Sequence, residues 1–124
     1  MIWGLAKLCA APVVAVLLAA ATTAAATRHP APSLNPASDK LLRLSAAQRA
    51  ATLAQIVAHW CVGTDTFLMG IVSDGPGRGN AYWSLRCADG SAWAIQIDPA
   101  GEFTAIGCDT YEANAPGKQC FKKF

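Results

Sequence analysis

The sequence lacks the residue patterns on which most small metal and redox sites depend. It contains no Cys-x-x-Cys pair, and its two histidines, His29 and His59, have no partner histidine at a ligand spacing. His59 and Cys61 are two positions apart and so do not face each other on a helix, which argues against a Cys–His nucleophile. We therefore expect no catalytic set, no metal and no cofactor, and we do not expect an enzyme.

Charge of either sign is also scarce. Charged residues make up 15% of the chain, and the formal net charge is only +2. No basic stripe runs along any segment, and Lys122 and Lys123 are too few to form a membrane-surface patch. Nucleic acid is therefore not an expected partner.

The glycine-rich stretch at residues 73–80, SDGPGRGN, lacks the lysine–serine pair of a phosphate-binding loop. Such a loop must also lead into a helix whose N–H groups bind the anion, whereas the next residues, AYWSL, are typical of a strand. We therefore predict an exposed, flexible hairpin loop. Arg78 at its tip is a candidate contact for a partner.

Long apolar runs are absent except near the N-terminus. Lys7 is followed by an apolar run and then by small residues that end in Ala24–Ala26. That order is typical of a secretory signal peptide at residues 1–26, and an uncleaved anchor is the alternative. We expect a periplasmic or secreted protein with no stable membrane association once the signal is removed.

Four cysteines follow the predicted signal: Cys61, Cys87, Cys108 and Cys120. An even number in a small exported domain predicts two disulfides, and a four-cysteine metal site or free thiols would be the alternative. Four cysteines allow three pairings, so their number alone does not fix the connectivity.

Residues 27–44 contain three prolines, which predicts a flexible lead-in before a disulfide-bonded domain at residues 45–124. Ser45 and Gln48 form the pattern of a capping box, which marks a helix start. Apolar residues then recur at helical spacing: Ala46, Ala50, Leu53, Ile56, Val57 and Trp60. Such a stripe must be buried against another element.

A sheet is the predicted partner of this helix, because four strand-length runs follow at residues 67–73, 80–87, 91–98 and 102–108. Two connections, ADG and PAG, have three residues with glycine last, the form of a type I turn closed by a glycine bulge. These turns place Cys87 opposite Ser91 and Asp98 opposite Glu102, which fixes the register of the last three strands.

This register divides the side chains between two faces. The face expected to pack against the helix carries Trp83, Leu85, Cys87, Trp93, Ile95, Ile97 and Phe103. The opposite face carries Tyr82, Ser84, Arg86, Ala94, Gln96 and Thr104. We expect the aromatic residues of the first face, and Trp60, to lie in the core.

The face of the sheet to which each cysteine points also suggests the disulfide pairing. Cys87 points to the helix side of the sheet and Cys61 ends the predicted helix, so we pair these two. Cys108 points to the opposite face and is expected to pair with Cys120 in the C-terminal segment. This bridge would hold an otherwise loose segment in an ordered position.

The predicted fold is therefore α+β: one N-terminal helix packed on a four-stranded antiparallel meander sheet with two disulfides. The opposite face of the sheet is expected to be open, as one face of an antiparallel sheet commonly is. Tyr82 and Arg86 on that face are candidate anchors for a protein or peptide, and an edge strand could also bind by strand addition.

Residues 45–106 resemble a PepSY-type domain, in which a helix precedes a meander whose last hairpin reads like Ile97-Asp98-Pro99-Ala100-Gly101-Glu102. The chain also resembles small secreted or periplasmic bacterial proteins of unknown function. PepSY-like domains are associated with restraining peptidases or acting as non-catalytic exported modules. The resemblance implies an inhibitory or protein-binding module, and a thiol-redox or metal-binding protein that uses the four cysteines is the alternative.

Overall fold

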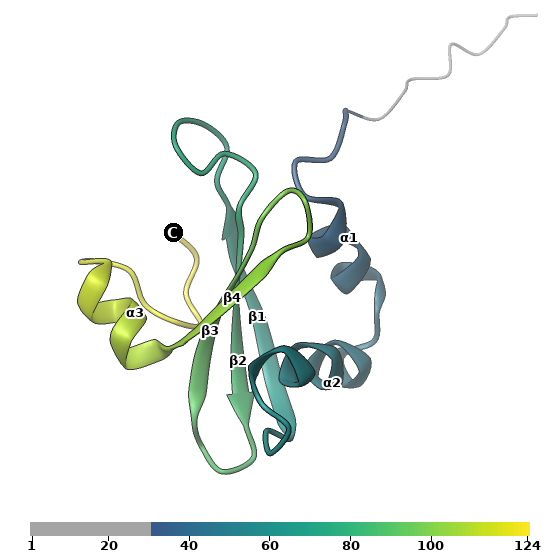
Figure 1. Ribbon diagram of the computed structural model, residues 1–124, viewed down its shortest axis with the longest axis vertical. Coiled ribbons are helices and arrows are strands. Elements are labelled where there is room, and N and C mark those ends of the chain that lie inside the picture. Colours follow the sequence, from purple (N-terminus) through teal and green to yellow (C-terminus); the bar gives the residue numbers. More distant parts are fainter. Residues whose placement is uncertain (1–30) are drawn as a thin grey trace, which may run out of the picture. The chain divides into compact units, whose positions relative to one another are not determined.

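The computed structural model describes residues 31–124, so the predicted signal peptide (1–26) and the start of the predicted lead-in lie outside it. The elements are α1 (Pro36–Arg43), α2 (Ala46–Val57), β1 (Gly63–Ile71), β2 (Ala81–Cys87), β3 (Ala92–Ile97), β4 (Phe103–Gly107) and α3 (Cys108–Asn114). The strands form one antiparallel sheet in the order β1-β2-β3-β4, which is a meander (Figure 1). The α+β class, the four-stranded sheet and two disulfides are confirmed, but this part of the chain has three helices where one was expected.

Helix α1 occupies part of the predicted flexible lead-in. Its N-cap, Asn35, accepts a hydrogen bond from the backbone N–H of Ser38 at 2.9 Å, and Pro36 lies in the first turn. A proline there costs no hydrogen bond, because the first N–H groups of a helix have no partner within it. The prolines were therefore weak evidence for a flexible segment, and residues 31–44 belong to the same compact unit as the sheet.

Asn35 also ties α1 to the sheet. Its side-chain amide donates to the carbonyl oxygens of Gly79 and Ile97, both at 2.8 Å, and the residue is fully buried. The buried hydroxyl of Ser38 accepts a hydrogen bond at 3.0 Å from the indole N–H of Trp83. Because these polar groups have partners, their burial avoids the cost of an unmade hydrogen bond.

Helix α2 begins with the predicted capping box, in which the side chains of Ser45 and Gln48 each accept a hydrogen bond from the other's backbone N–H. The sequence had suggested a helix that ends at Cys61, but α2 already ends at Val57. The chain must turn there, because Cys61 is bonded to β2 and β1 already begins at Gly63.

Turn chemistry sets the register of β2, β3 and β4 as predicted. Gly90 and Gly101 have φ angles of 88° and 87°, which the glycine bulge requires. Trp83 lies opposite Ile95. The first strand was less well predicted, because β1 starts at residue 63 and pairs with β2 through two register shifts.

We call the side of the sheet that carries α1 and α2 the helix face, and the side crossed by α3 and the C-terminal tail (residues 115–124) the tail face (Figure 1). The main core lies on the helix face and contains Leu41, Leu53, Ala54, Cys61, Ala81, Trp83, Leu85, Cys87, Ile95 and Ile97. Two predicted core aromatics lie outside it, because Trp60 is 57% exposed and Phe103 is 55% exposed. Trp60 follows the end of α2, and Phe103 lies on an edge strand.

Both disulfides have the predicted pairing. Cys61–Cys87 joins the segment after α2 to the end of β2, with a Cα–Cα distance of 5.3 Å. Cys108–Cys120 joins the start of α3 to the C-terminal tail, with a Cα–Cα distance of 6.0 Å. The second bridge restrains a segment that contains no helix or strand, so a covalent link holds the tail to the start of α3.

Candidate functional site

The sequence had suggested an open face around Tyr82 and Arg86, but the C-terminal tail covers part of this face, while Arg86 remains exposed. The hydroxyl of Tyr82 bonds to the side-chain oxygen of Gln96 at 3.0 Å, and its ring centroid lies 5.7 Å from that of Phe124. The guanidinium carbon of Arg86 lies 4.7 Å from the ring centroid of Phe121. Both predicted anchors therefore hold the chain's own tail.

The tail is fixed to the sheet by its two phenylalanines. The backbone N–H of Phe121 donates to the buried hydroxyl of Ser84 at 2.9 Å. The ring of Phe124 lies against Gly70, where a Cβ atom would come within 2.9 Å of the ring. Because Gly70 has no side chain, β1 leaves room for this ring. No periodic pattern in the sequence marks such contacts, so they were missed.

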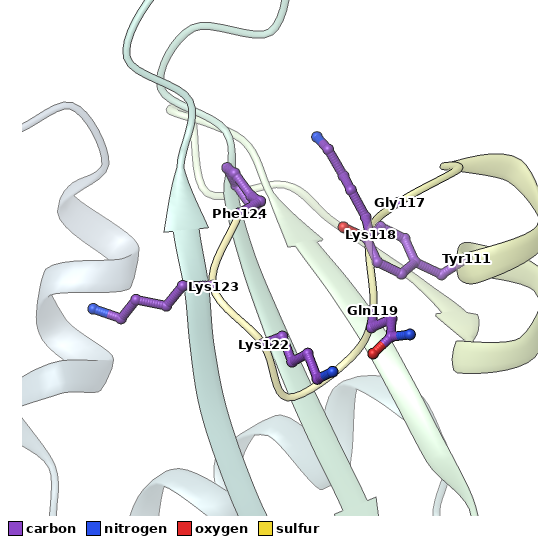
Figure 2. A pocket seen from close by; sticks show the side chains of 7 residues that line it. All are labelled: Tyr111, Gly117, Lys118, Gln119, Lys122, Lys123 and Phe124. Atoms are coloured by element: carbon purple, nitrogen blue, oxygen red, sulfur yellow. The ribbon is translucent and has the colours of Figure 1, made fainter.

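A hollow of about 220 Å³ opens between α3 and the tail (Figure 2), lined by Tyr111, Gly117, Lys118, Gln119, Lys122, Lys123 and Phe124. The ammonium of Lys118 lies 4.5 Å from the ring centroid of Phe124, whereas Lys122 and Lys123 extend in different directions (Figure 2). Burial, and secondarily a neighbouring tyrosine, raises the pKa of Tyr111, so its hydroxyl stays protonated at neutral pH. The lysine side chains do not converge on one point, so they do not form an anion site.

Arg78 lies in the loop between β1 and β2, away from regular structure. This loop joins two antiparallel strands, as predicted, and Gly75, Gly77 and Gly79 all have positive φ. Its base is packed, because a Cβ at Gly79 would come within 2.8 Å of the Leu34 carbonyl oxygen. The loop does not lead into a helix, so it lacks the geometry of a phosphate site.

An apolar groove of about 270 Å³ lies on the helix face between α1, α2 and the start of β4. It is lined by Ala37, Lys40, Leu41, Leu44, Thr52, Ile56, Ile97, Gly101 and Phe103. No sequence pattern marked this groove, because part of its wall belongs to α1, which lies in the predicted flexible lead-in. The signal that could have revealed it is Asn35–Pro36, a cap followed by a proline at the first helical position.

The two edges of the sheet differ in their protection. At one edge, β1 pairs with β2 through two register shifts, carries Asp65 and contacts α2. Bulges, charges and covering helices of this kind discourage pairing with another chain. At the other edge, β4 has no charged residue and no proline, and it pairs with β3 without a register shift.

The backbone of β4 turns hydrogen-bonding groups away from the sheet. Because Asp98 N–H bonds to the carbonyl of Glu102, the alternation of an antiparallel ladder turns Phe103, Ala105 and Gly107 outward. The Gly107 carbonyl begins α3, which leaves three N–H groups and the carbonyls of the other two residues. No other strand in residues 31–124 pairs with this side of β4.

Side chains that could hold a metal ion do not gather in this part of the chain. Among residues 31–124, no three His, Cys, Asp or Glu side chains are placed to hold a metal ion together. Cys61, Cys87, Cys108 and Cys120 are all engaged in disulfides. In the same range, no helix has both the length and the apolar character needed to span a membrane.

No protein-family model, no curated protein and no solved structure matches this chain. The candidate site therefore rests on the contacts and the edge geometry described above, and the resemblance to PepSY-type domains stays a prediction.

Proposed function

We propose that this chain is an exported, non-catalytic module that binds an extended segment of a polypeptide at the β4 edge. The observation that carries this proposal is the difference between the two edges, since β1 has register shifts and a charged residue, whereas β4 has neither. An extended segment can add to such an edge as a further strand, and its main-chain hydrogen bonds supply the affinity.

Hollows on both faces of the sheet flank β4 and give the added strand its side-chain preference. The apolar groove lies on the helix face. A second, smaller hollow of about 190 Å³ on the tail face is lined by Tyr82, Ala94, Gln96, Thr104, Ile106 and Tyr111. Because successive side chains of a strand alternate between faces, neighbouring residues of the ligand would face one hollow and then the other. We expect an apolar ligand segment with few charges.

Export is supported by two independent features. The order of residues 1–26 is that of a signal peptide, and disulfides persist in oxidising compartments such as the periplasm or the outside of the cell. In this setting the partner is a protein or peptide, without nucleic acid and without stable membrane association. The resemblance to PepSY-type domains makes a secreted peptidase, held by this module, a candidate partner.

The alternative function, thiol-redox chemistry or metal binding by the four cysteines, gains no support from the structure. Each of these cysteines is bonded to another cysteine. Forming a thiol site would first require reduction of a bridge, and nothing observed favours that step.

A displayed peptide library tests the proposed function. The disulfide-bonded chain, purified from the periplasm of a bacterial host, is used to select peptides, and each Kd is then measured for wild type and Ala105→Pro. The proline removes the central outward N–H and leaves the bonds from β4 to β3 intact, so we expect binding to weaken at least about tenfold. Leu42→Ala, at an exposed position of α1, is the control. Peptides that bind Ala105→Pro as tightly as wild type would show that the edge is not the site.

A further inference from the structure

We infer that the polypeptide the β4 edge fits best is β4 of a second copy of this chain, paired antiparallel to form a continuous eight-stranded sheet. This inference rests on the proposed function, because it uses the same edge and the same strand addition. It adds the identity of the partner and the register of the pairing.

The backbone of β4 is self-complementary about Ala105. A two-fold axis through the sheet at this point places Ala105 opposite Ala105 of the second copy, and Phe103 opposite Gly107. Because all three residues turn their backbones outward, the two Ala105 residues exchange hydrogen bonds, and each Gly107 N–H donates to a Phe103 carbonyl. The reverse bond, from the Phe103 N–H to the Gly107 carbonyl of the other copy, is not made, because that carbonyl begins α3, so the Phe103 N–H of each copy has no partner in the added strand.

The side chains on the helix face match in the same register. Phe103 is 55% exposed, whereas a Cβ built at Gly107 would have no atom within 4 Å, so this end of the strand has open space. The Phe103 ring of one copy would cover Gly107 of the other and reach Trp93, which lies opposite Gly107 on β3. An aromatic side chain across from a glycine fills the space that the glycine leaves and stabilises the strand pair.

This register gives a role to Trp60 and Phe103, the two predicted core aromatics that lie exposed. Trp60 is 57% exposed, and its ring centroid lies 6.2 Å from that of Trp93. The two-fold axis therefore brings Phe103 of one copy to the Trp60–Trp93 pair of the other, twice over. Aromatic residues are enriched at protein interfaces and carry a large share of the binding energy there.

On the tail face, no charged side chain of β4 lies between the two paired strands. There, Thr104 of one copy lies opposite Ile106 of the other, and neither side chain repels its neighbour. Both copies keep α1 and α2 on the same face of the continuous sheet, because the two-fold axis runs through the sheet. The pairing therefore closes the edge of each copy and leaves no further free strand on that side.

Sedimentation equilibrium of the disulfide-bonded chain over a range of concentrations tests self-pairing. We expect wild type to be dimeric, and Phe103→Lys and Ala105→Pro each to raise the dimer Kd at least about tenfold. Leu42→Lys is the matched control, because it also replaces an exposed apolar residue by lysine but lies on α1. It should stay dimeric. Intact mass confirms that each variant keeps both disulfides, and Phe103→Lys changes an exposed side chain and so retains the fold.

The register is tested by placing the photo-crosslinker p-benzoylphenylalanine at position 103. Chains that carry it are mixed with isotope-labelled chains, irradiated and mapped by mass spectrometry. We expect crosslinks from one chain to Trp60 or Trp93 of the other. Crosslinks to the loop around Arg78, or to the tail, would overturn this register.

The outcomes separate this inference from the proposed function. A chain that stays monomeric at millimolar concentration, or a dimer that neither edge variant weakens, overturns self-pairing. If selected peptides still require the Ala105 N–H, the proposed function stands with a different partner. If no peptide binding depends on the edge either, both are overturned.

Discussion

The two faces of one sheet are covered in different ways. On the helix face, regular helices bury Leu53 and Trp83 to at most 1% exposure. On the tail face, Tyr111 belongs to a buried cluster against which Ala115 and Cys120 of the tail pack, and the last tail residue, Phe124, is itself 48% exposed. A cover made by an irregular segment has few backbone hydrogen bonds of its own, so it opens locally at a lower free energy than a packed helix does. The helix face should therefore open only on global unfolding, and the tail face before it.

The largest effect is expected from a cavity on the helix face. Leu53→Ala removes a fully buried side chain from the main core, so we expect the free energy of unfolding to fall by about 2–5 kcal/mol. Urea unfolding followed by circular dichroism measures this change. Leu42→Ala, at an exposed position, should change stability by less than about 0.5 kcal/mol. A cost for Leu53→Ala no larger than that of the control would show that the main core is not on this face.

Removing the second disulfide should loosen the tail face selectively. The Cys108→Ser, Cys120→Ser double variant opens a loop of 12 residues and should cost about 2–3 kcal/mol. Hydrogen exchange should accelerate at the amide of Phe121, which now loses its restrained contact with Ser84, while amides in β2 and β3 keep their protection relative to the new global stability. Uniform acceleration across both faces would contradict the distinction between them.

A smaller effect should link the last residue to β1. Phe124→Ala removes a half-exposed ring and should cost about 1 kcal/mol, whereas Gly70→Ala introduces a Cβ into the space of that ring. In a double-mutant cycle, Gly70→Ala should be destabilising alone and close to neutral when Phe124 is already alanine. Additive costs would mean that the ring does not rest on Gly70.

The smallest effect concerns the titration of Tyr111. Burial raises its pKa above the ordinary value near 10, which means that the folded chain holds this proton more tightly than the unfolded chain. The resulting stabilisation is complete below the unfolded pKa and is lost as the pH rises through the folded pKa. The Cys108→Ser, Cys120→Ser double variant, which releases the tail residue Cys120 packed against the Tyr111 cluster, should lower the pKa of Tyr111 towards its ordinary value, as measured by absorbance of the phenolate. An unchanged pKa would mean that the tail does not contribute to its burial.

Sequence reasoning recovered the elements whose signals are periodic or depend on turn chemistry. The glycines at 90 and 101 and the alternation of the strands were enough to place Trp83 opposite Ile95. The disulfide pairing followed from the same alternation. The turn rules are local, because Gly90 and Gly101 lie within the turns that they determine, and the alternation of side chains then carries that register along each strand.

The candidate site was harder to predict, because it depends on the outer edge of β4 having no neighbouring strand among residues 31–124. Two faces with alternating side chains were expected, but only the structure shows that the tail occupies Tyr82 and Arg86 and that β4 stays unpaired. Phe121 and Phe124 lie in a segment without periodicity, and their position is set by a disulfide to α3. Contacts of this kind follow from tertiary geometry and have no signal in a short window of sequence.

The buried amide of Asn35 imposes an order on assembly. Its acceptors, the carbonyls of Gly79 and Ile97, lie 44 and 62 positions later in the chain. As the chain emerges from the ribosome or from a translocation channel, Asn35 appears before Gly79 and Ile97. Its side-chain amide can form these two hydrogen bonds only after both residues have emerged. Helices α1 and α2 emerge before the part of the sheet on which they pack. Asn35, the first buried residue in 31–124, is therefore among the last to complete its hydrogen bonds.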